Sequence, residues 1–379
     1  MLTRLYIHNY KCYQNFEFDL GKIREALIIG ANGVGKSTIG HVLWILQRIG
    51  RGECQIDELI KINDAFELAN NGVVRIEASF EVDSSEYTYG FSLELPSGFK
   101  KLRVADERLV YNGETVFSRE RAQVVLQSAH GGESRFLLDW HELALPRIFI
   151  QEGLTPSAVM RVREIFSAIL ILVPNPDEVG AAVGDEAADY LEPTGKNLAG
   201  WIENLISSKH EIYGNIVAWI RESVGDFQGF RQSSAKDVQW PERSLLLKFK
   251  VEGGDESREI PLRDLSSGEK MFLLAAAVMA KNELDGPVLC FWDEPDNFYS
   301  IREIGRVMAS LRHAFSKGGQ LVVTSHSDEA IMKFPRESTY CLMRRSHLEP
   351  TSPIKCVVDR QRELGVKGDF RTALLMGDY

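Results

Sequence analysis

Two stretches of the chain carry residues that could bind phosphate groups, and the first is the more specific. Residues 30–37 read GANGVGKS and fit the pattern G-x-x-x-x-G-K-[ST]. Its glycines would let backbone N–H groups surround phosphates, and the positive end of a following helix favours the same anion. Lys36 is expected to neutralise the β- and γ-phosphates of ATP, and the Ser37 hydroxyl to bind Mg²⁺. The loop residues expected to bind ATP are Asn32, Gly33, Val34, Gly35, Lys36, Ser37 and Thr38.

Two acids follow an apolar run near the C-terminal third of the chain. Asp293 and Glu294 come directly after residues 288–292, which read VLCFW. Acids at the carboxyl end of a parallel strand stand where ligands bind. Asp293 would hold Mg²⁺, and Glu294 would polarise the attacking water. Combined with the phosphate loop, the pair predicts an ATPase.

A histidine follows the next apolar run. His326 comes just after residues 321–324, which read LVVT, and lies 32 residues beyond Glu294. A lone histidine is more often only a satisfied polar residue. That spacing fits one strand–helix–strand repeat, however, so the imidazole could reach the γ-phosphate. Glu294, His326 and Lys36 are therefore the expected catalytic residues.

The second phosphate-binding candidate reads LSSGEK, residues 265–270. Ser266 and Glu269 have the spacing of a capping box in front of the apolar helix expected over 271–280. The ordinary interpretation is a well-capped buried helix. The turn of Ser266, Ser267 and Gly268 would also expose a hydroxyl and free N–H groups at a helix start, which can bind an anion.

The surrounding pattern predicts an α/β protein. Residues 26–29 form a strand before the phosphate loop, and residues 73–117 alternate as in an antiparallel, half-exposed sheet. Helices are expected from Thr155-Pro156 to about Leu172, over 198–206 and over 212–224, and strands over 244–251, 288–292 and 321–324. The expected parts are 1–72 (head, with the phosphate loop), 73–150 (antiparallel β lobe), 151–243 (helical insert) and 244–379 (rest of the head).

Composition limits the other possibilities. The 379 residues carry a net charge of −10, so contact with DNA would need a local basic patch; the candidates are Lys100, Lys101, Arg103, Arg119, Arg121, Arg344 and Arg345. Five scattered cysteines without a CxxC pair argue against a zinc site or disulfide framework. No apolar run is long enough to span a bilayer, and the start has no secretory signature. We expect a cytoplasmic protein without a membrane partner.

The order of these motifs resembles that of the ABC-type ATPases, so the implied fold is a P-loop NTPase head with an antiparallel β insert and a helical subdomain. Residues 265–269 are similar to the family's LSGGQ turn, with Ser267 replacing a glycine and Glu269 a glutamine. In that family two heads pair head-to-tail, and each signature turn caps the γ-phosphate held by the other head. The resemblance thus implies that Ser266, Ser267, Gly268 and Glu269 act on the ATP of a second copy. Asp296 and Asn297 would fill the D-loop, which couples the heads.

The branch resembled is the SMC, RecF and OLD-like group, including compact ATPases of bacterial anti-phage systems. Residues 5–11, LYIHNYK, look like the start of that group, which places a phosphate-contacting basic residue at Lys11. The distance from Lys36 to Ser266 is much longer than in transporter ATPases. Gln151 is the candidate glutamine of the Q-loop and, with Ser37 and Asp293, a candidate Mg²⁺ ligand.

The resemblance implies a head-to-tail homodimer, or a higher assembly, that holds two ATP·Mg²⁺ and parts on hydrolysis. Only 53 residues follow His326, so we expect no nuclease domain in the chain and an effector partner, such as a nuclease, in phage defence. The alternative is a RecF-like DNA repair ATPase that binds DNA directly. A transporter subunit and a scaffold that does not hydrolyse ATP are further alternatives.

Overall fold

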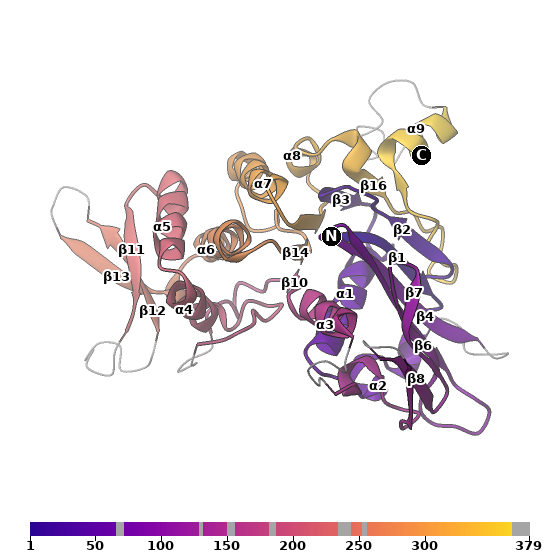
Figure 1. Cartoon of the computed structure of the whole chain (residues 1–379). Helices are drawn as coiled ribbons and strands as arrows, with labels where there is room; N and C mark the ends of the chain where they lie inside the picture. Colours follow the sequence, from indigo (N-terminus) through magenta and orange to yellow (C-terminus); the bar gives the residue numbers. More distant parts are fainter. Residues whose placement is uncertain are drawn as a thin grey trace. The chain divides into compact units, whose positions relative to one another are not determined.

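The computed structural model of the chain describes residues 1–65, 72–128, 132–149, 156–181, 187–233, 244–251 and 256–365. These residues form two compact units. The first unit comprises Met1–Ile169 and Pro335–Tyr379, and the second comprises Leu170–Phe334. Figure 1 labels the elements of both, and each unit is described here by itself. No helix in the described ranges is both long and apolar enough to cross a membrane.

An antiparallel sheet of eight strands dominates the first unit. Its order is β2-β1-β4-β5-β6-β7-β8-β9. The strands are β1 (Leu2–His8), β2 (Phe16–Asp19), β4 (Val73–Val82), β5 (Ser85–Glu94), β6 (Arg103–Tyr111), β7 (Glu114–Glu120), β8 (Gln123–Gln127) and β9 (Glu133–Leu137). Strands β4 to β7 confirm the antiparallel sheet predicted over 73–117. The sheet extends beyond that range because β1 pairs with β4 and β8 pairs with β7.

The phosphate loop of the first unit lies between β3 (Glu25–Ile29) and α1 (Lys36–Gly50). Strand β3 pairs in parallel with β16 (Thr339–Cys341), which pairs antiparallel with β17 (Lys355–Cys356). Helix α1 packs on α3 (Ser157–Ser167). A Cβ on Gly50 would lie only 2.5 Å from the Cβ of Phe166, so a glycine permits this close approach. The unit's shorter helices are α2 (Ile56–Leu59), η1 (Ile62–Asp64), η2 (Leu145–Arg147), η5 (Arg336–Ser338) and α9 (Val357–Leu364).

The helix expected to run to Leu172 ends earlier, at Ser167. Residues Leu170–Leu172 instead form β10, which pairs in parallel with β14 (Leu289–Trp292). All three β10 residues are buried, and a short apolar run of this kind cannot be assigned to helix or strand by periodicity alone. The expected cap at Thr155 lies outside the described residues.

The second unit contains parallel strands in the order β10, β14 and β15 (Gln320–Thr324). Nearly every residue of these strands is buried, as predicted for β14 and β15 from their continuous apolar runs. Helix α6 (Ser267–Ala280) confirms the predicted apolar helix and is buried from Lys270 onward. The helices α7 (Ile301–Ser316), α8 (Asp328–Ile331) and the π-helical turn η4 (Lys281–Asp285) complete this part.

Two helices and a small sheet form the remainder of the second unit. Helices α4 (Leu198–Ser208) and α5 (Glu211–Ser223) confirm the predicted helices, and their apolar stripes are buried. Helix α5 packs on α6, with Trp219 and Phe272 at 6.0 Å between ring centroids. Its stripe therefore serves packing. The antiparallel strands β11 (Phe227–Gln232), β12 (Leu245–Lys250) and β13 (Ser257–Pro261) lie beside α5, and η3 (Leu262–Asp264) follows them.

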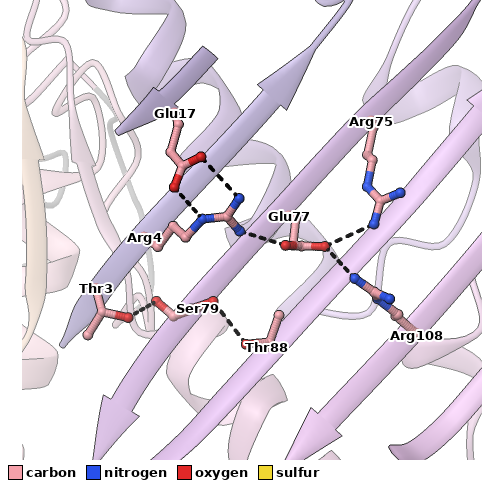
Figure 2. Close-up of polar contacts among 8 residues, drawn as sticks. All are labelled: Thr3, Arg4, Glu17, Arg75, Glu77, Ser79, Thr88 and Arg108. Atoms are coloured by element: carbon pink, nitrogen blue, oxygen red, sulfur yellow. Dashed lines mark hydrogen bonds and ion pairs between the residues drawn. The ribbon is translucent and has the colours of Figure 1, made fainter. Parts of the chain in front are cut away.

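A charged cluster ties the strands of the eight-stranded sheet together on its solvent side. Glu77 on β4 accepts hydrogen bonds from Arg4 (2.6 Å), Arg75 (3.0 Å) and Arg108 (2.8 Å), as Figure 2 shows. Burial opposes ionisation of this carboxyl, but the three guanidinium groups outweigh it and lower the pKa of Glu77 to about 2. Arg4 also donates to Glu17 on β2, at 2.8 Å. The cluster thus links β2, β1, β4 and β6.

A glycine on β5 makes possible the contact between Glu77 and Arg108, which crosses that strand. Gly90 is the cross-strand partner of both Glu77 and Arg108, so it lies directly between them. A Cβ at this position would approach the Cβ and Cγ of Glu77 to 3.2 Å. Because β5 offers no side chain there, Arg108 can reach over the strand to the carboxylate.

We expect Glu77→Gln to lower the free energy of unfolding by about 1–3 kcal/mol at pH 7, because three guanidinium groups lose their shared anion. The folded pKa of Glu77 lies below its unfolded value of 4.5, so its stabilisation is complete above that value and is lost as pH falls toward 2. The gap between parent and variant should narrow in urea unfolding at pH 3. Glu86→Gln, an exposed carboxylate on β5, is the control. An equal gap at both pH values would contradict this account.

Candidate phosphate-binding and hydrolysis site

Three glycines shape the loop between β3 and α1. Gly30, Gly33 and Gly35 have φ values of +151°, +78° and +111°, a region that other residues rarely adopt. A Cβ on Gly30 would lie 2.4 Å from the carbonyl oxygen of Leu342. The loop therefore needs glycine at these places both for backbone conformation and for space.

The side chain of Lys36 folds back over this loop. Its Nζ donates to the carbonyl oxygens of Gly30 (2.9 Å) and Ala31 (3.2 Å). Ser37 is exposed in the first turn of α1, as are Asn32 and Gly33 in the loop. The structure thus brings the loop residues and Lys36 together around one helix start, which suits the binding of an anion.

Residues 11–13, near the N-terminus, contact the phosphate loop and helix α1. The hydroxyl of Tyr13 donates to the carbonyl oxygen of Gly35 at 2.8 Å. A Cβ on Gly35 would lie 2.7 Å from the Sγ of Cys12. Lys11 has a φ of +49°, and its charge contributes, after burial, to lowering the pKa of His41 in α1 to about 4. The predicted Lys11 therefore lies near the phosphate-loop helix, whereas the role of Tyr13 was not visible in any motif.

A second brace comes from the segment after β16. The Oγ1 of Thr351 donates to the carbonyl oxygen of Val34 at 2.7 Å, and Arg344 donates to that of Gly33 at 3.2 Å. A Cβ on Gly33 would lie 3.2 Å from the Nε2 of His347. The sequence marked Arg344 only as part of a basic pair, because a contact over more than 300 residues leaves no local pattern.

The two predicted acids of the second unit follow β14 and are held by Thr324. Its hydroxyl donates to Oδ1 of Asp293 at 2.5 Å and accepts the backbone N–H of Glu294 at 3.0 Å. Glu294 has a φ of +48°. A non-glycine residue in this left-handed region costs roughly 1–2 kcal/mol, so surrounding contacts must hold it there.

Both carboxylate oxygens of Glu294 have protein partners. Asn297 donates to Oε2 at 2.7 Å, and Nε2 of His326 lies 3.1 Å from Oε1. The side chains of Glu294 and His326 remain 32% and 41% exposed, so the carboxylate is oriented and still open to water. The structure thus brings together Glu294, His326 and Asn297, which the sequence predicted from separate motifs.

The other D-loop residue, Asp296, has a buried side chain. Asp296 accepts a hydrogen bond from the hydroxyl of Ser325 at 2.9 Å, and its Oδ1 is buried with no partner among the described residues. Burial raises the pKa of Asp296, against the effect of the Ser325 hydrogen bond. Its expected contact with a second copy stays a prediction.

The signature turn forms the predicted capping box. Ser266 donates its backbone N–H and its hydroxyl to Oε2 of Glu269, at 2.9 and 2.6 Å, and accepts the Glu269 N–H at 3.4 Å. Ser266 and Ser267 are exposed at the start of α6. The helix itself is fixed below them, where Nζ of Lys270 donates to the carbonyl oxygen of Pro176 at 2.9 Å.

The expected Mg²⁺ ligands are distributed over both units. Ser37 belongs to the first unit and Asp293 to the second, while Gln151 lies outside the described residues. A hydroxyl and a carboxylate are oxygen donors of the kind that Mg²⁺ prefers. The donor types therefore fit the ion, and its binding stays a prediction.

Tyr13→Phe should weaken ATP binding about three- to tenfold, because the Gly35 carbonyl loses the hydrogen bond that steadies the loop. Equilibrium binding of a fluorescent ATP analogue measures the change. Tyr6→Phe is the control, since that hydroxyl donates instead to Oδ1 of Asn15, just before β2. Equal losses of affinity in the two variants would show that the loop contact has no particular effect.

The sequence matches two family models. Residues 1–157 match the AAA ATPase domain, and residues 218–332 match the AAA domain described as a putative AbiEii toxin of a type IV TA system. The first range includes the phosphate loop, and the second includes the signature turn, Asp293, Glu294 and His326. No curated protein matches the sequence.

The fold is that of solved SMC heads. An SMC head bound to the C-terminal winged-helix domain of ScpA has a TM-score of 0.57 at 14% identity, over 95% of this chain and 99% of that one. An SMC head from Pyrococcus furiosus, with an extended coiled coil and bound to the C-terminal domain of ScpA, has a TM-score of 0.51 at 15% identity, over 96% and 98%. Residues 1–157 and 218–332 are therefore similar to AAA ATPase domains, and the chain has the fold of an SMC head, as expected from the resemblance of its motifs.

Proposed function

We propose that the chain binds ATP·Mg²⁺ and hydrolyses ATP as a dimeric switch that gates a partner effector. The observation that carries the proposal is the environment of Glu294. This carboxylate follows the buried strand β14, is oriented by Asn297 and His326, and stays open to water. A positioned acceptor of this kind is what phosphoryl transfer to water requires.

The chain's residues divide the reaction between them. Lys36 neutralises the β- and γ-phosphates, and the N–H groups of the phosphate loop hold the same oxygens. Ser37 and Asp293 would hold Mg²⁺, which neutralises charge on the phosphates when bound. Glu294 orients the attacking water and accepts its proton, while His326 contacts the γ-phosphate from the end of β15.

The signature turn supports the head-to-tail dimer. Ser266 and Ser267 are exposed at the start of a helix that is buried from Lys270 onward, so the turn is exposed at the end of a firmly packed helix. The positive end of the helix favours an anion at this place. In the proposed dimer this anion is the γ-phosphate held by the Lys36 of a second copy.

An effector partner fits the comparisons better than direct action on DNA. One matching family description names a putative toxin of a toxin–antitoxin system, which supports a defence role, and the similar SMC heads were solved with ScpA domains bound. Among the basic residues suggested for DNA, Lys101 pairs with Asp57 and Arg103 with Glu94, while Arg119 and Arg344 donate to backbone carbonyl oxygens. A RecF-like role in DNA repair is therefore the second candidate. For either function, the cytoplasm is the proposed location.

We expect Glu294→Gln to bind ATP with nearly parental affinity, to hydrolyse it at least 100-fold more slowly and to accumulate as a dimer with ATP. The amide keeps the shape of the side chain but cannot accept the proton of water. Binding of a fluorescent ATP analogue, phosphate release and light scattering measure the three effects. Glu303→Gln, which changes a carboxylate at the start of α7, is the control. Turnover of ATP by Glu294→Gln at the parental rate would remove Glu294 from its role.

Dimer formation through the signature turn is tested with Ser267→Arg. Ser267 is exposed, and its substitution spares the capping bonds of Ser266. The variant should bind ATP as the parent does but fail to dimerise with it, because the larger charged side chain blocks the approach of a second copy. Gln123→Arg, at an exposed position of β8, should dimerise normally.

Mixing variants tests whether the turn acts on the other copy. Lys36→Ala has a defective loop and an intact turn, and Ser267→Arg has the reverse. A mixed dimer would therefore contain one intact composite site and one doubly defective site, so at most half of the parental rate should return. A rate no higher than that of the two variants measured separately would contradict action between copies, because a turn that acted on the ATP of its own copy would leave every site defective.

A further inference from the structure

Three consecutive residues at the end of β15 hold the acids that follow β14. Thr324 contacts Asp293, Ser325 contacts Asp296, and His326 contacts Glu294. The first of these residues was not singled out by any sequence motif. Its contacts are within the second unit and join the two acids on which the proposed hydrolysis depends.

The hydroxyl of Thr324 serves both acids at once. Its one proton is donated to Oδ1 of Asp293 at 2.5 Å, and its oxygen accepts the backbone N–H of Glu294 at 3.0 Å. Thr324 has no exposed surface, so water cannot replace the hydroxyl without rearrangement. A carboxylate oxygen is a stronger acceptor than water, which orients the hydroxyl proton toward Asp293.

The bond to Glu294 holds a conformation that the residue would not otherwise keep. Glu294 has a φ of +48°, and its N–H is donated to Thr324. Trp292, the last residue of β14, pairs with Val323, so Asp293 follows directly after β14 at the level of Thr324, the last residue of β15. The position of both acids is thereby set by the neighbouring strand.

We propose that Thr324 is a positioning residue for ATP hydrolysis, whose single hydroxyl fixes the Mg²⁺-binding carboxylate of Asp293 and the backbone of Glu294 together. The inference rests on the proposed function. It adds that metal binding and water activation depend on one shared side chain outside the motifs that contain the two acids.

Replacing the Thr324 hydroxyl should change the rate of ATP hydrolysis and its dependence on Mg²⁺ more than it changes the affinity for the nucleotide. In Thr324→Val, Oδ1 of Asp293 and the N–H of Glu294 lose this partner at almost unchanged volume. We expect kcat to fall about 10- to 100-fold and the Mg²⁺ concentration for half-maximal rate to rise several-fold, as for outer-shell partners of metal ligands. Binding of a fluorescent ATP analogue in EDTA should change less than about twofold, because the phosphate loop is intact.

Two further variants separate positioning from general stability. Thr324→Ser keeps the hydroxyl and should retain kcat within about threefold. Thr339→Val removes another fully buried threonine hydroxyl, which donates to the carbonyl oxygen of Pro335, and should leave kcat and the Mg²⁺ dependence unchanged. If Thr324→Val does not fold, Thr324→Cys is measured instead, since a thiol is a weak donor of similar size.

Each outcome decides between defined alternatives. A parental kcat and Mg²⁺ dependence in Thr324→Val, or in the Cys variant, would overturn the positioning role while leaving the proposed function intact. Equal losses in Thr324→Val and Thr339→Val would assign the effect to stability and overturn it as well. An inactive parent protein would overturn the proposed function itself, and the positioning role with it.

Discussion

Glu294 must be held in place by its neighbours, because its backbone lies in a region that favours glycine. Thr324 holds its N–H, Asn297 holds one carboxylate oxygen, and His326 lies at hydrogen-bond distance from the other. These contacts compensate for a strain of roughly 1–2 kcal/mol and leave the carboxylate aimed and partly exposed. Strain of this kind is typical of functional sites, where geometry is maintained against local preference. The parallel pairing of β14 with β15 supplies the rigid frame on which this arrangement depends.

The parts of the site that could be predicted from the sequence are those whose residues lie close together along the chain. The phosphate loop requires its glycines and lysine at fixed spacing, and the capping box of Ser266 and Glu269 is a three-residue relation; the structure contains both. Asp293 and Glu294 were recognisable because polar residues follow an apolar run. The half-exposed sheet over 73–117 was predictable for a similar reason, since alternation of side chains is a property of each strand alone.

The parts that were missed depend on contacts between distant residues. Tyr13 reaches Gly35, Thr351 reaches Val34, and Thr324 reaches Asp293, and none of these pairs has a characteristic spacing. The assignment of Leu170–Leu172 to a helix was wrong because three buried apolar residues fit a helix end as well as a strand. Only the pairing with β14 decides between the two. The division of the chain into two compact units was likewise not apparent from composition.

Glu269 of the signature turn would affect the affinity of two copies for each other. In the capping box, the carboxylate of Glu269 lies 2.6 Å from the very hydroxyl that would meet a γ-phosphate in the proposed dimer. A glutamine would bring no charge there, whereas glutamate brings an anion toward an anion. Capture of triphosphate would therefore have to redirect the Ser266 hydroxyl and overcome electrostatic repulsion. In the proposed dimer, such an interface would close only while the full set of attractive contacts is present, and the repulsion would favour its release.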